Sequence, residues 1–233
     1  MALPFFYIKD YEGEQQVVLD EDTSRHVVQV LRMKTGEKLN LTDGRGNLVF
    51  CEIADENKKH CTANVFEIRK QKPKIKNITI GISLLKNSNR FEWFLEKATE
   101  IGVCEIIPLI CERTEREKFR YDRMNAICIS AMLQSQQCWL PVLQEPVLFS
   151  KAIKDINTEG KFVAHCMDSG NKNNLSTLHP FNSTTIVIGP EGDFTSKEIE
   201  LALQHQFVPV SLGETRLRTE TAGVVAAVML MNS

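Results

Sequence analysis

The chain has 233 residues, of which 42% are hydrophobic and 25% are charged. These values are ordinary for a globular protein and exclude a collagen-like, coiled-coil or disordered chain. The formal net charge of −2 at pH 7 argues against a protein that coats nucleic acid along its whole surface. At about 150 residues per domain, this length predicts one or two domains.

Features that the sequence lacks indicate the cellular compartment of the protein. No run of about 18 apolar residues exists, so no membrane-spanning helix is expected, and the first residues do not resemble a signal peptide. The seven cysteines are scattered and form no C-x-x-C pair, which indicates reduced thiols rather than a disulfide frame or a zinc site. We therefore expect a cytoplasmic protein with no membrane partner and no metal.

The first third of the chain is predicted to be mostly β-structure. A helix is expected over Thr23–Met33, capped by Thr23 or Ser24, because apolar residues recur there at helical spacing. The turn residues Asp43–Asn47 predict a hairpin. The expected strands are residues 5–8, 16–19, 38–42, 48–53 and 62–68. Short strands with one helix indicate a small β-barrel, and we place this first domain at residues 1–72.

A basic stretch follows, and the domain boundary is placed in it at Pro73. Between Ile68 and Phe91 there are cations but no acid, namely Arg69, Lys70, Lys72, Lys74, Lys76, Lys86 and Arg90. Such a stretch attracts phosphates within a Debye length of about 8 Å. Alternatively, it is a linker that its lysines keep solvated.

The rest of the chain, residues 73–233, alternates between strands and helices. Strands are expected at residues 78–85, 105–110, 162–167, 184–188 and 207–212, and helices at 90–102, 122–138, 149–156, 195–206 and 219–231. Gly102 is placed as a helix C-cap, and Thr195 with Glu198 as a capping box. This alternation predicts an α/β domain with a largely parallel sheet.

Two loops of unusual composition follow strands of this domain. The first is Ile188–Phe194, whose glycines let the backbone approach a ligand closely. The second, Leu212–Thr221, opens the last helix, where free N–H groups suit an anionic group. Neither loop is a Walker A or a G-x-G-x-x-G sequence. Each alone is explained as a tight turn with helix caps, but together, at the carboxyl ends of strands, they predict a ligand pocket.

These loops carry a resemblance to a known family. Ile188–Gly192, followed by Leu212-Gly213 and Leu217–Ala222, resembles the signature of the RsmE family. Further segments that resemble the family are Glu96–Val103, Cys111–Thr114 and His26–Gly36. The resemblance therefore covers nearly the whole chain.

The resemblance implies an α/β fold in which residues 1–72 form a PUA-like RNA-binding β-barrel. Residues 73–233 would form a SPOUT methyltransferase domain with a C-terminal trefoil knot. It implies a homodimer that uses S-adenosyl-L-methionine to methylate N3 of a uridine in 16S rRNA, uridine 1498 in the usual rRNA numbering, free or in the small ribosomal subunit. Alternatives are another RNA acceptor or a ribosome-assembly protein that has lost catalysis.

By the same resemblance, several residues are expected to bind the methyl donor. They are His165, Ile188, Gly189, Pro190, Glu191, Gly192, Leu212, Gly213, Leu217, Arg218 and Thr219. His165 is alternatively a polar residue with its hydrogen bonds satisfied at a strand end. RNA contacts are expected at Arg25, Arg32, Lys86, Arg90 and Arg113. The last helix has a small-residue face, compatible with a dimer contact or with packing on the sheet, made of Ala222, Val225, Ala226 and Met229.

The acceptor sets the catalytic requirement. Uridine N3–H is a weak acid, and the anion formed when it loses its proton is stabilised by a nearby guanidinium. Arg218 is the first candidate for this role and Arg113 the second. Glu220 is a candidate proton acceptor, or it stabilises the helix N-terminus through the dipole. Thr219 is expected to cap the helix.

The sequence departs from the family pattern after the predicted helix 122–138. The family commonly has Glu-Gln there, and then an Arg before a proline. This chain keeps Gln134 and Pro141 but has Leu133 and Gln137 at the Glu and Arg positions. If that arginine holds RNA in the family, this chain must replace it.

Overall fold

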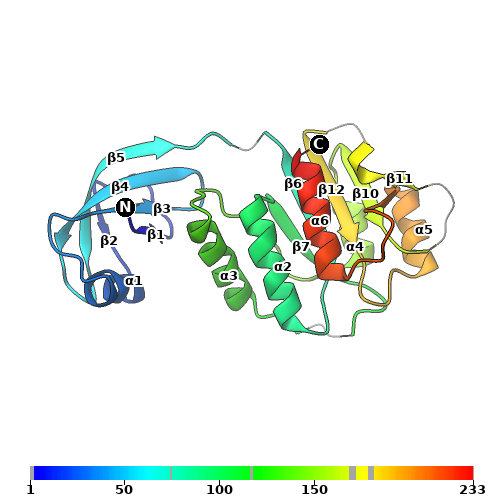
Figure 1. Ribbon diagram of the computed structural model, residues 1–233, viewed down its shortest axis with the longest axis horizontal. Helices are drawn as coiled ribbons and strands as arrows, with labels where there is room; N and C mark the ends of the chain where they lie inside the picture. Colours follow the sequence, from blue (N-terminus) through cyan, green and yellow to red (C-terminus); the bar gives the residue numbers. More distant parts are fainter. Residues whose placement is uncertain (1–2, 74, 116–117, 168–171, 178–180, 233) are drawn as a thin grey trace. The chain divides into compact units, whose positions relative to one another are not determined.

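The computed structural model describes residues 3–73, 75–115, 118–167, 172–177 and 181–232. Contacts within the chain divide it into two compact units. The first comprises residues 1–73 together with 132–140, and the second comprises residues 74–131 and 141–233. Figure 1 draws the helices and strands of both units.

The first unit is built on one five-stranded sheet with the order β1-β3-β4-β5-β2. Its strands are β1 (Phe5–Tyr7), β2 (Gln16–Val18), β3 (Lys38–Thr42), β4 (Asn47–Asp55) and β5 (Thr62–Lys70). The predicted hairpin is confirmed, because β3 and β4 pair antiparallel. Alternate residues such as Leu39 and Val49 are fully buried. Within the described residues β1 and β2 are the sheet edges, so strand pairing does not close the expected barrel.

The predicted helix Thr23–Met33 is wrong at both ends. The α-helix α1 spans Glu21–Arg25 and continues as a π-helix, η1, over His26–Val30. The carboxylate of Asp20, not Thr23 or Ser24, caps α1, because its Oδ1 accepts from the Thr23 amide at 2.8 Å. The chain leaves the helix before Met33, since Arg32 has a φ of +56°.

Residues 132–140 belong to the first unit, which differs from the expected second domain of residues 73–233. The ring of Trp139 lies directly against Gly46, where a Cβ atom would stand only 2.3 Å from ring carbon Cζ2. Backbone hydrogen bonds join Gly46 to Cys138 and Leu140 to Gly44. Gly46 therefore provides the space in which an indole from far along the chain packs.

The second unit contains an eight-stranded sheet with the path β11-β13-β10-β12-β6-β7-β8, and β9 also pairs with β7. Among the described residues, all neighbouring strands of this sheet pair parallel, which confirms the predicted largely parallel sheet. The strands are β6 (Asn77–Ser83), β7 (Glu105–Ile110), β8 (Val142–Leu143), β9 (Val147–Leu148), β10 (Gly160–Ala164), β11 (Asn173–Asn174), β12 (Ser183–Ile188) and β13 (Val208–Ser211).

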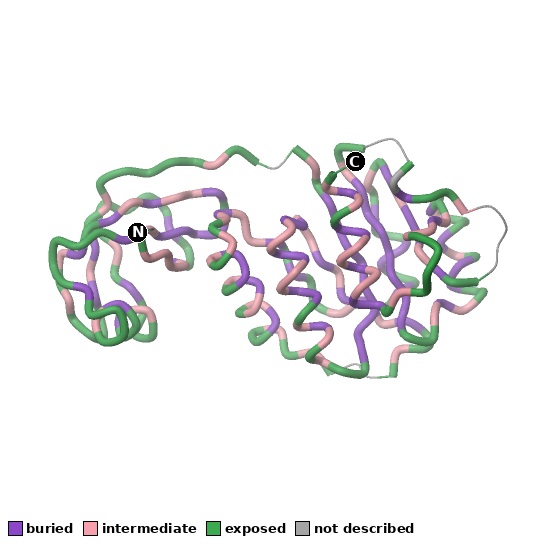
Figure 2. The backbone as a smooth tube through the Cα atoms, in the orientation of Figure 1, coloured by how far each residue is buried: buried purple, intermediate pink, exposed green. Residues whose placement is uncertain are grey.

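Helices cover both faces of this sheet (Figure 1). They are α2 (Ser88–Ile101), α4 (Phe149–Asp155), α5 (Ser196–Gln204) and α6 (Thr219–Asn232). The chain also forms α3 (Tyr121–Gln134) and a short 3-10 helix, η2, at Leu175–Thr177. Helix α6 packs on α2 and β6, on the face to which Ile82 points. Val187 points to the opposite face and joins Phe149 of α4 in a buried cluster. The central strands are accordingly buried along nearly their whole length (Figure 2).

Local signals for helix ends are confirmed where a specific residue provides them. Gly102 ends α2 with a φ of +103°, and the capping box of Thr195 and Glu198 is present in both directions. Helix α3, however, ends at Gln134 rather than at residue 138. The chain turns at Gln136, whose φ is +57°.

Gly223 lets helices α2 and α6 approach closely. A Cβ atom built on Gly223 would lie 2.6 Å from Cε2 of Phe94 and 3.0 Å from Cδ1 of Ile82. We expect Gly223→Val to lower the free energy of unfolding by about 1–3 kcal/mol, because the added methyl groups overpack this contact. Denaturant titration measures this, with the exposed Lys154→Ala of α4 as control at roughly 0.5 kcal/mol or less. Equal stability of Gly223→Val and the wild type would contradict the prediction.

The cysteines are free thiols, as the sequence indicates. Burial raises the pKa of Cys51 and of Cys111 to about 12. Thiols of this kind are unreactive core residues. Cys166 is the exposed one.

Candidate functional site

The strand order brings the two glycine loops to one edge of the sheet. Strands β13, β10, β12, β6 and β7 are neighbours and parallel, so their carboxyl ends lie side by side. The segments that follow β10, β12 and β13 line a single cavity of about 540 Å³. Cavities of this size hold cofactors and other small molecules.

The buried ring of Phe194 supports the first glycine loop, Ile188–Phe194. Phe194 is fully buried, and its ring centroid lies 4.9 Å from that of Phe149. A Cβ atom on Gly189 would stand 3.1 Å from Cδ2 of Phe194, so glycine allows the loop to pass over the ring. The Asp193 amide donates to the Pro190 carbonyl at 2.9 Å, which closes the turn. The loop is therefore held on the core before any ligand arrives.

The second loop is joined to the first by Thr219. Its hydroxyl donates to the carbonyl of Gly189 at 3.0 Å, and both groups are buried. The capping role expected for Thr219 did not include this bond between loops that are distant in sequence. Gly213 has a φ of +138°, which favours glycine.

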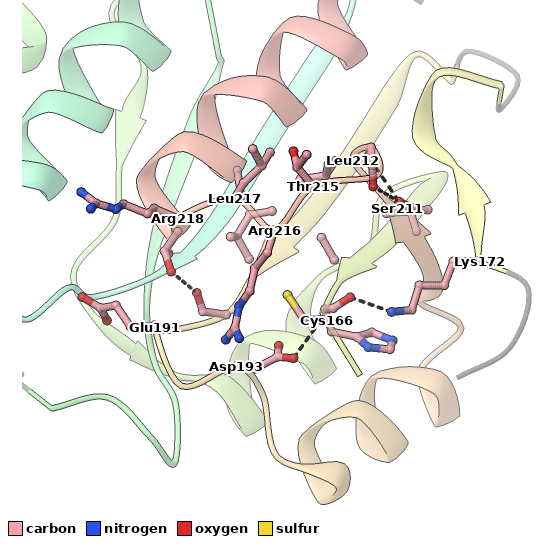
Figure 3. Close-up of a pocket in the computed structure, with 18 of the residues that line it drawn as sticks. Cys166, Lys172, Glu191, Asp193, Ser211, Leu212, Thr215, Arg216, Leu217 and Arg218 are labelled. Carbon is pink, nitrogen blue, oxygen red and sulfur yellow. Dashed lines mark hydrogen bonds between the residues drawn. The ribbon is translucent and has the colours of Figure 1, made fainter. Parts of the chain in front are cut away.

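Most residues expected to bind the donor meet at this cavity, part of which Figure 3 draws. The expected residues among those that line it are His165, Ile188, Gly189, Pro190, Glu191, Leu212, Gly213, Leu217, Arg218 and Thr219. Gly192 does not line it. The carbonyl of Gly192 instead accepts from Nη1 of Arg113 at 2.6 Å, so Arg113 lies beside the first loop.

Glu220 also lies outside the cavity lining. It is only 6% exposed at the start of α6, and its Oε1 stands 3.6 Å from Nε of Arg90. Its Oε2 has no hydrogen-bond partner among the described residues. This placement, near an arginine and the positive end of α6, favours the helix-stabilising role over direct contact with an acceptor.

His165 lies at the end of β10 and is 8% exposed. Burial, and secondarily the charge of Lys172, lower the pKa of its imidazole. Neither ring nitrogen has a hydrogen-bond partner in the part of the chain that the structure describes. A buried imidazole without a partner costs free energy, which a polar ligand group would recover on binding.

The lowered pKa of His165 predicts a pH dependence of stability. Below the ordinary histidine pKa of about 6.5 the unfolded chain binds more protons than the folded chain, so unfolding becomes easier as pH falls. We expect the free energy of unfolding of the wild type to decrease more steeply from about pH 7.5 to 5 than that of His165→Asn. Denaturant titrations over this range measure the slopes, and equal slopes would contradict the prediction.

Several residues that line the cavity were not predicted as site residues. Among them, Cys166, Lys172, Asp193 and Arg216 bear on how the cavity binds a ligand. Asp193 lies in the first glycine loop and Arg216 in the second. A charged side chain within a predicted ligand loop was the signal that could have identified them. Lys172 carried no signal, because its role depends on folding: its Nζ donates to the carbonyls of His165 and Met167 at 2.7 and 2.6 Å.

The residues expected to contact RNA lie in both units. Arg25 and Arg32 are exposed in the first unit, and Arg25 forms an ion pair with Glu21. In the second unit Lys86, which follows β6, pairs with Glu115 at 2.6 Å. Lys86 and Arg113 follow β6 and β7, at the sheet edge that also carries the cavity. Exposed pairs of this kind exchange partners at little cost, so these cations are available to phosphates.

The sequence departs from the family pattern at Leu133 and Gln137, and neither side chain carries a charge. Leu133 is in α3, and Gln137 follows this helix, with its side-chain amide donating to the Ser135 hydroxyl at 2.9 Å.

Among the described residues there is no group of three side chains suited to hold a metal ion. No helix in those same segments is long and apolar enough to cross a membrane.

Two family models match the chain. A model described as an RNA methyltransferase domain matches residues 71–231. A model described as an RNA methyltransferase PUA domain matches residues 19–66. Together they span both units.

Individual relatives agree with these models. The ribosomal RNA small subunit methyltransferase E of Buchnera aphidicola is 30% identical over 98% of this chain and 92% of its own length. The crystal structure of a probable rRNA-methyltransferase from Porphyromonas gingivalis is 40% identical, with a TM-score of 0.90 over 97% of this chain and 95% of its own. That of ribosomal RNA small subunit methyltransferase E from Neisseria gonorrhoeae, bound to S-adenosyl methionine, is 28% identical, with a TM-score of 0.88 over 99% and 98%.

Proposed function

This chain belongs to the RsmE family of small-subunit ribosomal RNA methyltransferases, and from that premise we propose its donor, acceptor and acceptor atom. The donor is S-adenosyl-L-methionine, and the acceptor is N3 of a uridine in 16S rRNA, uridine 1498 in the usual numbering. The observation that carries the proposal is the cavity that both glycine loops line together.

The cavity suits the donor. Its volume of about 540 Å³ is adequate for a nucleoside with an amino-acid tail. Gly213 lines the cavity without a Cβ atom, and the unpartnered imidazole of His165 offers a hydrogen bond to a polar group. When bound, the sulfonium supplies an activated methyl group. The chain's part is to hold donor and acceptor in line, which accelerates the reaction by many orders of magnitude.

The acceptor side of the reaction is assigned to Arg218. In Figure 3 its side chain extends away from Arg216 and Cys166, on the side of Glu191. A guanidinium there would stabilise the negative charge on O2 and O4 of the uridine as N3 loses its proton. Arg113, which is bound to the Gly192 carbonyl, is the second candidate. Glu220 remains a candidate proton acceptor only if α6 shifts, since it is buried beside Arg90.

The RNA contacts are proposed to be divided between the two units. N3 lies on the Watson–Crick edge of the base, so the uridine must be unpaired or flipped out of its helix. Lys86, Arg90 and Arg113 of the second unit would hold flanking phosphates. Arg25 and Arg32 of the first, PUA-like unit would extend the contact. A reaction on ribosomal RNA would take place in the cytoplasm.

A trefoil knot and a homodimer remain proposals from the family resemblance. Of the predicted dimer face on α6, Ala226 is fully buried by its own chain. Val225 and Met229 are half-buried, and Val228 is 43% exposed. An apolar strip left partly uncovered supports a contact between two copies.

Mass-spectrometric mapping of small-subunit rRNA from a deletion strain tests the acceptor. We expect one N3-methyluridine to disappear and to return when the gene is restored. If every methyluridine persisted, the proposed acceptor would be wrong. Calorimetric titration with S-adenosylhomocysteine tests the donor site separately, and no binding at high protein concentration would contradict it.

A further inference from the structure

Two arginines that line the cavity, Arg216 and Arg218, carry charges that no described residue of the chain pairs. Lys172 is held by two backbone carbonyls, and Arg218 extends away from the other lining side chains (Figure 3). Arg216 instead runs across the cavity from the second glycine loop. It makes no hydrogen bond or ion pair with any residue that the structure describes, so all its N–H donors are available to a ligand.

An acidic group faces Arg216 and is firmly held. Figure 3 shows the guanidinium of Arg216 directed toward Asp193. Oδ1 of Asp193 accepts from the Phe194 amide at 2.9 Å, and Oδ2 accepts from the Cys166 amide at 2.8 Å. These bonds fix the carboxylate between the first glycine loop and the end of β10. The cavity therefore presents a fixed negative charge opposite an unpaired positive one.

We propose that Arg216 and Asp193 form a subsite for a zwitterionic amino-acid group. The guanidinium would bind the α-carboxylate with two parallel N–H donors, and the Asp193 carboxylate would attract the α-ammonium. This inference rests on the proposed function, because the methyl donor ends in such a group. It adds that affinity for the donor depends on the amino-acid end, and not on the nucleoside alone.

Two ligands that differ in this end provide the test. S-adenosylhomocysteine carries the amino-acid group, whereas 5′-methylthioadenosine lacks it. We expect the wild type to bind the first more tightly, and Arg216→Ala to weaken it roughly tenfold, the equivalent of about 1.4 kcal/mol. The affinity for methylthioadenosine should stay unchanged. Arg216→Lys should fall between, since a lysine keeps the charge but not the paired donors.

Calorimetry measures both ligands on each variant, with the exposed Lys151→Ala of α4 as a control for loss of one positive charge. Equal weakening of both ligands by Arg216→Ala would assign the residue to loop structure and overturn the inference. Unchanged affinity for both would overturn it as well. If the wild type bound neither ligand, the donor site itself would be wrong, which separates failure of the proposed function from failure of the subsite.

Discussion

Replacing Arg218 with alanine is expected to lower the rate of methyl transfer by about 10²–10³-fold, while affinity for S-adenosylhomocysteine changes less than about twofold. The reason is that charge develops on the uridine only as N3 loses its proton, and the side chain extends away from the other residues of the donor cavity (Figure 3). Single-turnover transfer to small ribosomal subunits measures the rate, and calorimetry measures the affinity.

Two variants sharpen this experiment. Arg218→Lys should recover part of the rate, because it restores a positive charge without the planar fork of donors. Lys154→Ala removes an exposed cation of α4, away from the cavity lining, and should leave the rate unchanged. If Arg218→Ala turned over like the wild type, Arg218 would have no part in the chemistry. If the affinity of Arg218→Ala for S-adenosylhomocysteine fell by as much as its rate, Arg218 would be assigned to donor binding instead.

The second large effect is expected at Phe194. Truncation to alanine should lower the free energy of unfolding by about 3–5 kcal/mol, because a fully buried ring leaves a cavity beneath Gly189. The first glycine loop then loses its support, so affinity for S-adenosylhomocysteine should fall at least about tenfold, or 1.4 kcal/mol. Denaturant titration and calorimetry measure the two effects.

Phe149→Ala is the matched control for Phe194. It removes the partner ring from the same cluster but lies on α4, outside the loop. It should destabilise the fold by a similar amount and weaken ligand binding much less. If Phe194→Ala does not fold, Phe194→Leu takes its place in both measurements, because leucine keeps most of the buried volume. Equal loss of affinity in both alanine variants would mean that general destabilisation, and not loop support, is responsible.

Local signals in the sequence were reliable where one residue decides a conformation. Gly102 ends α2 in the left-handed region, and Thr195 with Glu198 starts α5 with a capping box. Each depends only on backbone groups a few residues away. The start of α1 was misplaced for a related reason: Asp20, Thr23 and Ser24 all have capping side chains, and the fold places Ser24 in the core.

The sequence alone determined the alternation of strands and helices and the two glycine loops, since these follow from periodicity and local backbone freedom. The individual residues expected to bind the donor came from the resemblance to the RsmE family. Only the tertiary structure decided which distant groups meet. Trp139 packs on Gly46 because glycine leaves room for an indole, and Thr219 binds Gly189 because parallel strands end at one edge. It also left His165 without a partner and directed Arg216 toward Asp193. Such contacts depend on how elements pack together, which spacing along the chain does not encode.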